Sequence, residues 1–246
     1  MKELKILTLN IWRYFDWEKR KDLVINLLKE QNADVVFLQE ACYDDRLKNK
    51  YENQVDEVNR KLKYPYFVFT KEADMKKLLN SQPISWKMFY GLGILSKYKI
   101  KKSEKIALPH VESDRDFTYL HCSLETEEGN MDVINVHFEN NDKGSKKHLR
   151  TVLQWSKKKK IKPVIAGDFN IIKTENLIEL ADKDYHISYK IKPYLSFMPT
   201  QFSYNKVPVA LDYIIAHKKA FNIKSIECIN SSVSDHFPVL AEIEKI

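Results

Sequence analysis

The clearest pattern along the chain is a series of short aliphatic segments that end on a polar residue. In the first of them, residues 4–10, Leu4 and Ile6 stand at alternate positions, and this period of two predicts a strand. Residues 34–39 form a nearly continuous apolar run that predicts a buried strand ending at Glu40. The same criteria predict further strands over residues 66–70, 93–96, 117–125, 131–138, 163–167, 210–216, 223–229 and 238–243.

Apolar residues that recur every three or four positions predict three helices. In the segment 17–30, Leu23 and Leu27 would lie on one face of such a helix. The other two helices are predicted over residues 52–62 and 145–159. Strands and helices interspersed in this way predict an α/β or α+β protein.

Composition narrows the class of protein. The chain has 246 residues without a repeat or a linker-like segment, so we expect one domain over residues 1–246. With 43% hydrophobic and 30% charged residues, it is neither disordered nor of low complexity. Three scattered cysteines predict neither a disulfide framework nor a zinc site, and they favour a reducing compartment. Because no apolar run reaches the ~18 residues of a membrane span and no signal-peptide core is present, we expect a cytoplasmic location.

The net charge of +7 favours a polyanionic partner without identifying one. Two segments are predicted to be long surface loops, residues 71–90 and 108–116. The first, from Lys71 to Tyr90, mixes lysines with aromatic side chains, which suits either nucleic acid or an anionic lipid surface. The same aromatic side chains could equally pack the loop against the protein. No feature of the chain indicates an obligate protein partner.

Polar residues that can carry chemistry stand at the ends of most predicted strands. Taken singly, each has an ordinary explanation such as a turn or a cap, although a carboxylate inside an apolar strand needs a partner. Together their carboxylate and amide oxygens form a hard ligand set that suits Mg²⁺ or Mn²⁺ better than zinc. These residues are Asn10, Glu40, His137, Asp168, Asn170, Asp212, Asp235 and His236.

On these residues the sequence resembles the endonuclease/exonuclease/phosphatase superfamily, which shares the fold of pancreatic deoxyribonuclease. The matching segments follow the family's order and span nearly the whole chain. They are Thr8-Leu9-Asn10-Ile11-Trp12, Asp34-Val35-Val36-Phe37-Leu38-Gln39-Glu40, Gly91-Leu92-Gly93-Ile94-Leu95-Ser96, Asn135-Val136-His137, Gly167-Asp168-Phe169-Asn170, Leu211-Asp212-Tyr213-Ile214 and Ser234-Asp235-His236-Phe237-Pro238.

The resemblance implies a four-layer α/β/β/α sandwich of two packed, mainly antiparallel sheets, with the active site at one edge. It also implies a phosphoester hydrolase that uses a divalent cation, usually Mg²⁺. Glu40 would be the principal metal carboxylate, with Asn10 and Asp235 nearby in the metal shell.

The same resemblance implies roles for the remaining residues. Asp168 would orient or deprotonate the attacking water, and Asn170 would hold the phosphate or the water. His236 would stabilise the charged transition state and be oriented by Asp212, with His137 as a second phosphate-facing histidine. In-line attack on a phosphodiester spreads negative charge over oxygens, which a metal ion and an imidazolium can neutralise.

Two features depart from the family pattern. Arg13 stands where many relatives have glycine, so access beside Asn10 can differ. In the deoxyribonuclease branch the counterpart of His137 has an acidic partner, for which the sequence offers only Asp114 or Asp116 as weak candidates.

The branch motifs narrow the expected activity. Residues 135–138 lack the apurinic endonuclease pattern, and residues 209–213 lack that of the inositol 5-phosphatases. We therefore expect a metal-dependent phosphodiesterase or nuclease that acts by in-line water attack. The alternatives are a phosphomonoesterase, a phospholipid-headgroup hydrolase of the sphingomyelinase type or, outside the enzymes, an inactive binding module. The last is disfavoured because every expected site position is filled.

Overall fold

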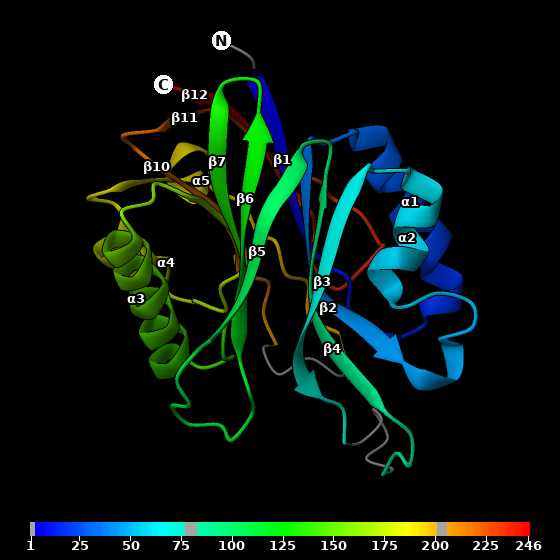
Figure 1. Ribbon diagram of the computed structural model, residues 1–246. Helices are drawn as coiled ribbons and strands as arrows, with labels where there is room; N and C mark the ends of the chain where they lie inside the picture. The colour runs from blue at the N-terminus through cyan, green and yellow to red at the C-terminus, as the bar shows by residue number, and fades with distance from the viewer. Residues whose placement is uncertain (1–2, 77–82, 201–205) are drawn as a thin grey trace.

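Two six-stranded sheets pack face to face in the computed structural model, which describes residues 3–76, 83–200 and 206–246 (Figure 1). The first sheet has the order β11-β12-β1-β2-β4-β3, and only β1 and β2 pair in parallel. Its strands are β1 (Glu3–Asn10), β2 (Val35–Asp44), β3 (Tyr66–Asp74), β4 (Met88–Ser96), β11 (Phe221–Cys228) and β12 (Val239–Lys245).

The second sheet has the order β5-β6-β7-β8-β10-β9, and here only β7 and β8 pair in parallel. Mainly antiparallel pairing in both sheets confirms the expected sheet type. Its strands are β5 (Lys99–Ala107), β6 (Thr118–Thr126), β7 (Gly129–His137), β8 (Val164–Asp168), β9 (Tyr185–Ile187) and β10 (Asp212–His217).

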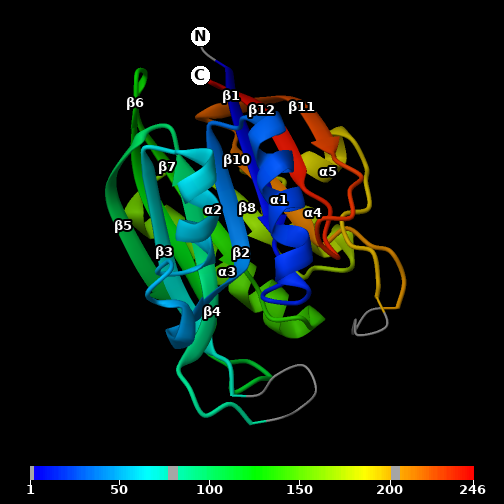
Figure 2. The ribbon, with the colours of Figure 1, turned by 90° about the vertical axis from the view of Figure 1, so that its right-hand side faces the viewer.

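Helices cover the outer face of each sheet and complete the four layers. The first sheet is covered by α1 (Trp17–Gln31) and α2 (Gln54–Leu62), which face the viewer in Figure 2. The second is covered by α3 (Asp142–Lys159) and α4 (Thr174–Ala181), on the left of Figure 1. Two short helices, η1 (Asp45–Leu47) and α5 (Ser188–Ile191), join the remaining elements.

Three apolar cores separate these four layers. Between the sheets lie side chains such as Phe37 and Leu120, all removed from water. The other two cores lie between each sheet and its helices. This arrangement confirms the α/β/β/α sandwich. Within the described residues, no helix is both long and apolar enough to cross a membrane.

All of the predicted strands and helices are present, although some bounds differ. The sequence pattern missed β5, in which exposed and half-buried positions alternate with a lysine-rich exposed face. Such a composition is typical of an edge strand, where charged residues prevent pairing with other chains, and β5 is an edge of its sheet. The helix α4 and the short strand β9 were also missed.

The predicted surface loop over residues 71–90 needs correction, because both of its ends belong to strands. Its first residues continue β3 and its last residues begin β4, which pair with each other. Its aromatic side chains pack against neighbours: Phe89 stacks on Tyr43 with ring centroids 4.6 Å apart. The guanidinium of Arg46 lies 3.7 Å from the ring centroid of Trp86. The alternative in which these rings pack the segment down is therefore correct for Phe89 and Trp86.

Asn135 of β7 joins the two sheets through three hydrogen bonds. Its Nδ2 donates to the carbonyl oxygens of Leu38, at 3.0 Å, and Gly93, at 2.8 Å. Its Oδ1 accepts from Nε2 of Gln39 at 2.7 Å. All of these atoms are buried, so each is costly to leave without a partner.

We expect Asn135→Leu to lower the free energy of unfolding by about 3 kcal/mol, because it leaves buried polar groups of both sheets unpaired. Denaturant unfolding followed by circular dichroism measures the change. The control is Asn130→Leu, an exposed position of the same strand, where we expect little change. If Asn135→Leu lowers the free energy of unfolding by less than about 1 kcal/mol, the three hydrogen bonds of Asn135 stabilise the fold no more than an apolar side chain does.

Candidate active site

Strand pairing brings the predicted residues to one end of the sandwich. In the second sheet His137 pairs with Asp168, and Asp168 with Asp212, on the adjacent strands β7, β8 and β10. In the first sheet β1 ends at Asn10, which pairs with Gln39 of β2. Directly paired residues point to the same face of a sheet. The side chains of His137, Asp168 and Asp212 therefore lie together between the sheets.

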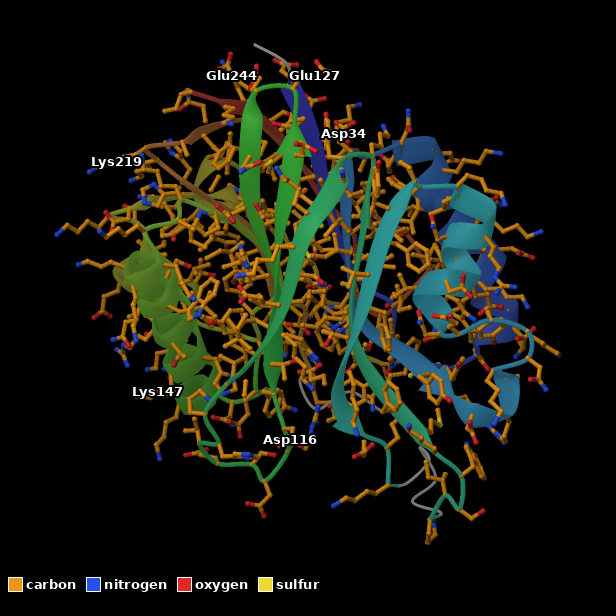
Figure 3. All side chains as sticks on the ribbon, in the orientation of Figure 1. Asp34, Asp116, Glu127, Lys147, Lys219 and Glu244 are labelled. Carbon is orange, nitrogen blue, oxygen red and sulfur yellow. The ribbon has the colours of Figure 1, made fainter. Side chains whose placement is uncertain are left out.

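A cavity of about 240 Å³ opens at this end. The loop before β6 also reaches it through Arg115, next to Asp116, which Figure 3 labels at the end of the molecule opposite Glu127 and Glu244. Among the eight predicted residues, only Asp212 is absent from the lining. The seven that line it are Asn10, Glu40, His137, Asp168, Asn170, Asp235 and His236.

Asp212 lies directly behind His236. Its Oδ2 is 2.8 Å from Nδ1 of His236 and also accepts a hydrogen bond from Oγ of Ser196 at 2.8 Å. Burial lowers the pKa of His236, but the carboxylate of Asp212 outweighs burial and raises that pKa well above its ordinary value. This pair orients the imidazole through Nδ1 and favours its cationic form.

A second histidine is held in the same way. Nδ1 of His137 lies 2.9 Å from Oε2 of Glu72, a residue of β3 that is almost fully buried. Burial lowers the pKa of His137, and Glu72 more than reverses this effect and raises it to about 9. The acidic partner of His137 is therefore Glu72, and the candidates Asp114 and Asp116 were wrong. Both lie exposed on the loop before β6.

Asp168 lies between the two imidazoles. Its Oδ2 is 3.8 Å from Nε2 of His137 and 3.9 Å from Nε2 of His236, and it accepts a hydrogen bond from Nδ2 of Asn10 at 3.2 Å. Burial raises the pKa of this carboxyl above its ordinary value, while the two imidazolium charges oppose the rise. A carboxylate with a raised pKa is suited to accept a proton.

Asn170 completes the turn that leaves β8. Its backbone N–H donates to Oδ1 of Asp168 at 3.0 Å, and its Nδ2 donates to the carbonyl of Phe138 at 2.9 Å. Its φ of 50° is left-handed, a conformation that asparagine tolerates better than most residues. The turn therefore fixes Asp168 and Asn170 relative to each other.

Glu40 reaches the cavity from an irregularity in β2. The register of β2 against β4 shifts between Leu38 and Ala41, and Glu40 has a left-handed φ of 54°. Such a bulge redirects a side chain that regular alternation would send elsewhere. Nε of Arg13 donates to Oε2 of Glu40 at 2.7 Å. Burial raises the pKa of Glu40, but Arg13 and His137 lower it to about 2, so Glu40 is ionised.

The donor set fits a divalent cation. Glu40, Asn10 and Asp235 line one cavity and carry oxygen ligands of the kind that Mg²⁺ prefers. Oδ1 of Asn10 also accepts a hydrogen bond from the backbone N–H of Trp12 at 3.0 Å. Burial raises the pKa of Asp235, and the charge of Glu40 adds to this rise against the opposing effect of His236. A cation between the two carboxylates would relieve their mutual repulsion. A second group, Asp168, Asp212 and His236, has ligand atoms within 4.8 Å of one another. It fits a metal less well, because Asp212 already contacts Nδ1 of His236.

Sequence reasoning missed three residues of this site. Glu72 lies in β3, whose register shifts between Lys71 and Ala73, so the alternation along the strand does not reveal which face Glu72 occupies. Arg115 lines the cavity from the loop before β6, and the only signal for it was its position beside a predicted strand. The role of Ser196 as a donor to Asp212 had no signal in the sequence.

The chain belongs to the Endonuclease/Exonuclease/phosphatase family, whose model matches residues 7–236. A curated relative, an uncharacterized protein of Acanthamoeba polyphaga mimivirus, is 26% identical, and the match covers 98% of this chain and 100% of that protein. A family protein from Leptotrichia buccalis superposes with a TM-score of 0.76 at 19% identity, covering 98% of this chain and 99% of that one.

A mannosyl-6-phosphatase of Bacteroides thetaiotaomicron superposes with a TM-score of 0.71 at 14% identity, covering 98% of this chain and 99% of that one. At these identities the two solved structures establish the shared fold. Family membership in turn supports a phosphoester hydrolase.

Proposed function

We propose that the protein is a Mg²⁺-dependent phosphodiesterase of the nuclease type, with Mn²⁺ as a possible substitute. The observation that carries this proposal is the pair of buried histidine–carboxylate contacts on either side of Asp168. His236 is held by Asp212 at 2.8 Å and His137 by Glu72 at 2.9 Å. Two imidazolium groups can neutralise the charge that spreads over a phosphodiester during in-line attack.

Each remaining residue has a role in this proposal. Asp168 accepts the proton of the attacking water, while Asn170 holds the phosphate or that water by hydrogen bonding. Glu40, Asn10 and Asp235 would hold the cation, which when bound polarises the phosphoryl oxygen and offsets its charge. The fixed orientation of both imidazoles supports this assignment, because preorganised donors need no rearrangement during the reaction.

Nucleic acid is the diester class that the charge favours. The net charge of +7 supports it, as does Arg115, whose guanidinium stands at the cavity. The aromatic side chains of residues 71–90 give less support, since Phe89 and Trp86 pack against the protein. Part of this segment, residues 77–82, lies outside the described residues. We also propose that residues 1–246 form one domain. We further propose a cytoplasmic location, which the free thiols of all three cysteines support.

The test compares a diester with a monoester. Purified protein should hydrolyse bis-p-nitrophenyl phosphate with Mg²⁺ or Mn²⁺, and EDTA should abolish this activity. Faster turnover of p-nitrophenyl phosphate would identify a phosphomonoesterase, and turnover of a phospholipid headgroup alone would identify a lipid hydrolase. No turnover of any phosphoester with any divalent cation would indicate a binding module.

We expect Glu40→Gln to raise the Mg²⁺ concentration for half-maximal activity by at least about tenfold, because even partners of metal ligands contribute 10–100-fold to metal affinity. Excess Mg²⁺ should restore part of the activity. Titration of activity with Mg²⁺ gives the measurement, and Glu227→Gln, an exposed position of β11, is the control. An unchanged Mg²⁺ requirement would exclude Glu40 as a metal ligand.

A further inference from the structure

Arg13 contributes a guanidinium to the cavity from a backbone whose carbonyl is held by a hydrogen bond. The residue follows β1 with a left-handed φ of 48°, and its carbonyl oxygen accepts a hydrogen bond from Nε2 of Gln54 at 3.1 Å. Its side chain lines the cavity and passes over the ring of Tyr90, 5.6 Å from the centroid. The arginine is therefore directed to this position by the fold.

Its contact with Glu40 is a direct ion pair. Nε of Arg13 lies 2.7 Å from Oε2 of Glu40, whose side chain is 10% exposed against 32% for Arg13. The other oxygen, Oε1, lies 3.9 Å from Nε2 of His137. The guanidinium thus takes one of the two oxygens that Glu40 can offer to any other cation.

A divalent cation at Glu40 would meet the same carboxylate charge that Arg13 already contacts. Burial raises the pKa of Glu40, and Arg13 makes the largest contribution that lowers it. A carboxylate whose charge is already compensated gains less from a second cation than one without a partner. A divalent cation that approached through Oε2 would meet the positive guanidinium at short range.

We propose that Arg13 competes with the divalent cation for Glu40, so that metal binding requires the guanidinium to leave Oε2. This inference rests on the proposed function, because it takes Glu40 as a metal ligand. The coupling is reciprocal: Arg13 weakens the binding of the metal to Glu40, and a bound metal weakens the contact between Arg13 and Glu40 by the same free energy.

The test is a Mn²⁺ titration of the metal-free protein, followed by electron paramagnetic resonance of the unbound ion. We expect Arg13→Gln and Arg13→Met to bind Mn²⁺ at least about fivefold more tightly than the wild type, the lower end of typical coupling between sites. Arg115→Gln is the matched control. It removes an equal charge from the cavity lining, and within the described residues it makes no ion pair with Glu40, although its charge also lowers the pKa of Glu40, by less than that of Arg13. We therefore expect Arg115→Gln to tighten Mn²⁺ binding clearly less than either Arg13 variant.

The outcomes separate this inference from the proposed function. Unchanged or weaker Mn²⁺ binding by folded Arg13→Gln or Arg13→Met would overturn the competition. Equal tightening by Arg115→Gln would reduce the effect to net charge and overturn it as well. Glu40→Gln tests the underlying site: if it binds Mn²⁺ as tightly as the wild type, the proposed metal site itself fails. Thermal unfolding of each variant confirms that it is folded.

Discussion

Asp168→Asn is expected to lower kcat by a factor of ~10² or more while the protein stays folded, the scale of losing a general base. The carboxylate lies within 4 Å of Nε2 of both His137 and His236, and burial already raises its pKa. Asparagine keeps the shape and can still accept the N–H of Asn170, but it cannot take a proton from water. Steady-state kinetics with saturating Mg²⁺ measures the loss.

Two accompanying measurements make this result specific. Mn²⁺ affinity should change little, because we do not assign Asp168 to the metal shell, and thermal unfolding should show an intact fold. Asp116→Asn removes an exposed carboxylate near the same end of the molecule and should leave kcat unchanged. A kcat for Asp168→Asn close to that of the wild type would exclude the proton-accepting role.

The second large effect is expected from the buried pair of His236 and Asp212. Each of His236→Ala and Asp212→Ala should reduce kcat/KM by ~10² or more, since the imidazole neutralises charge in the transition state and the carboxylate orients it. Nδ1 of His236 and Oδ2 of Asp212 are 2.8 Å apart, so the two residues act as one unit. The double variant should therefore have a kcat/KM little lower than that of the more severe single variant.

A second double-mutant cycle, between residues of different pairs, is the comparison for the cycle of His236 and Asp212. His236→Ala combined with Glu72→Ala removes one member from each of the two pairs, and their effects should come closer to multiplying. Multiplying losses in the His236–Asp212 cycle would show that Asp212 acts independently of the imidazole. Circular dichroism is needed for Asp212→Ala, because Asp212 also accepts the hydroxyl of Ser196.

The sequence by itself determined most of the strands and helices of this protein, and its resemblance to the family implied the four layers and most of the candidate site. Local patterns sufficed for the strands and helices because apolar periodicity reports which residues face a core, and the polar residues that interrupt it mark the strand ends. Asn10, His137 and Asp168 end β1, β7 and β8. Strands that run in parallel bring such ends to one edge, so the ordered motifs predicted which side chains line the cavity.

The resemblance implied the contact between His236 and Asp212, but only the tertiary structure decided which other charged groups of the site touch. Glu72 and His137 are 65 residues apart, and Arg13 and Glu40 are 27 apart. Both carboxylates lie at or beside a register shift in their strands, so sequence alternation does not give the direction of their side chains. The sequence also failed to predict the exposed edge strand β5 and the strand ends within residues 71–90, for a related reason. Their conformation is set by hydrogen bonds to a neighbouring strand, and no apolar pattern in their own sequence records that pairing.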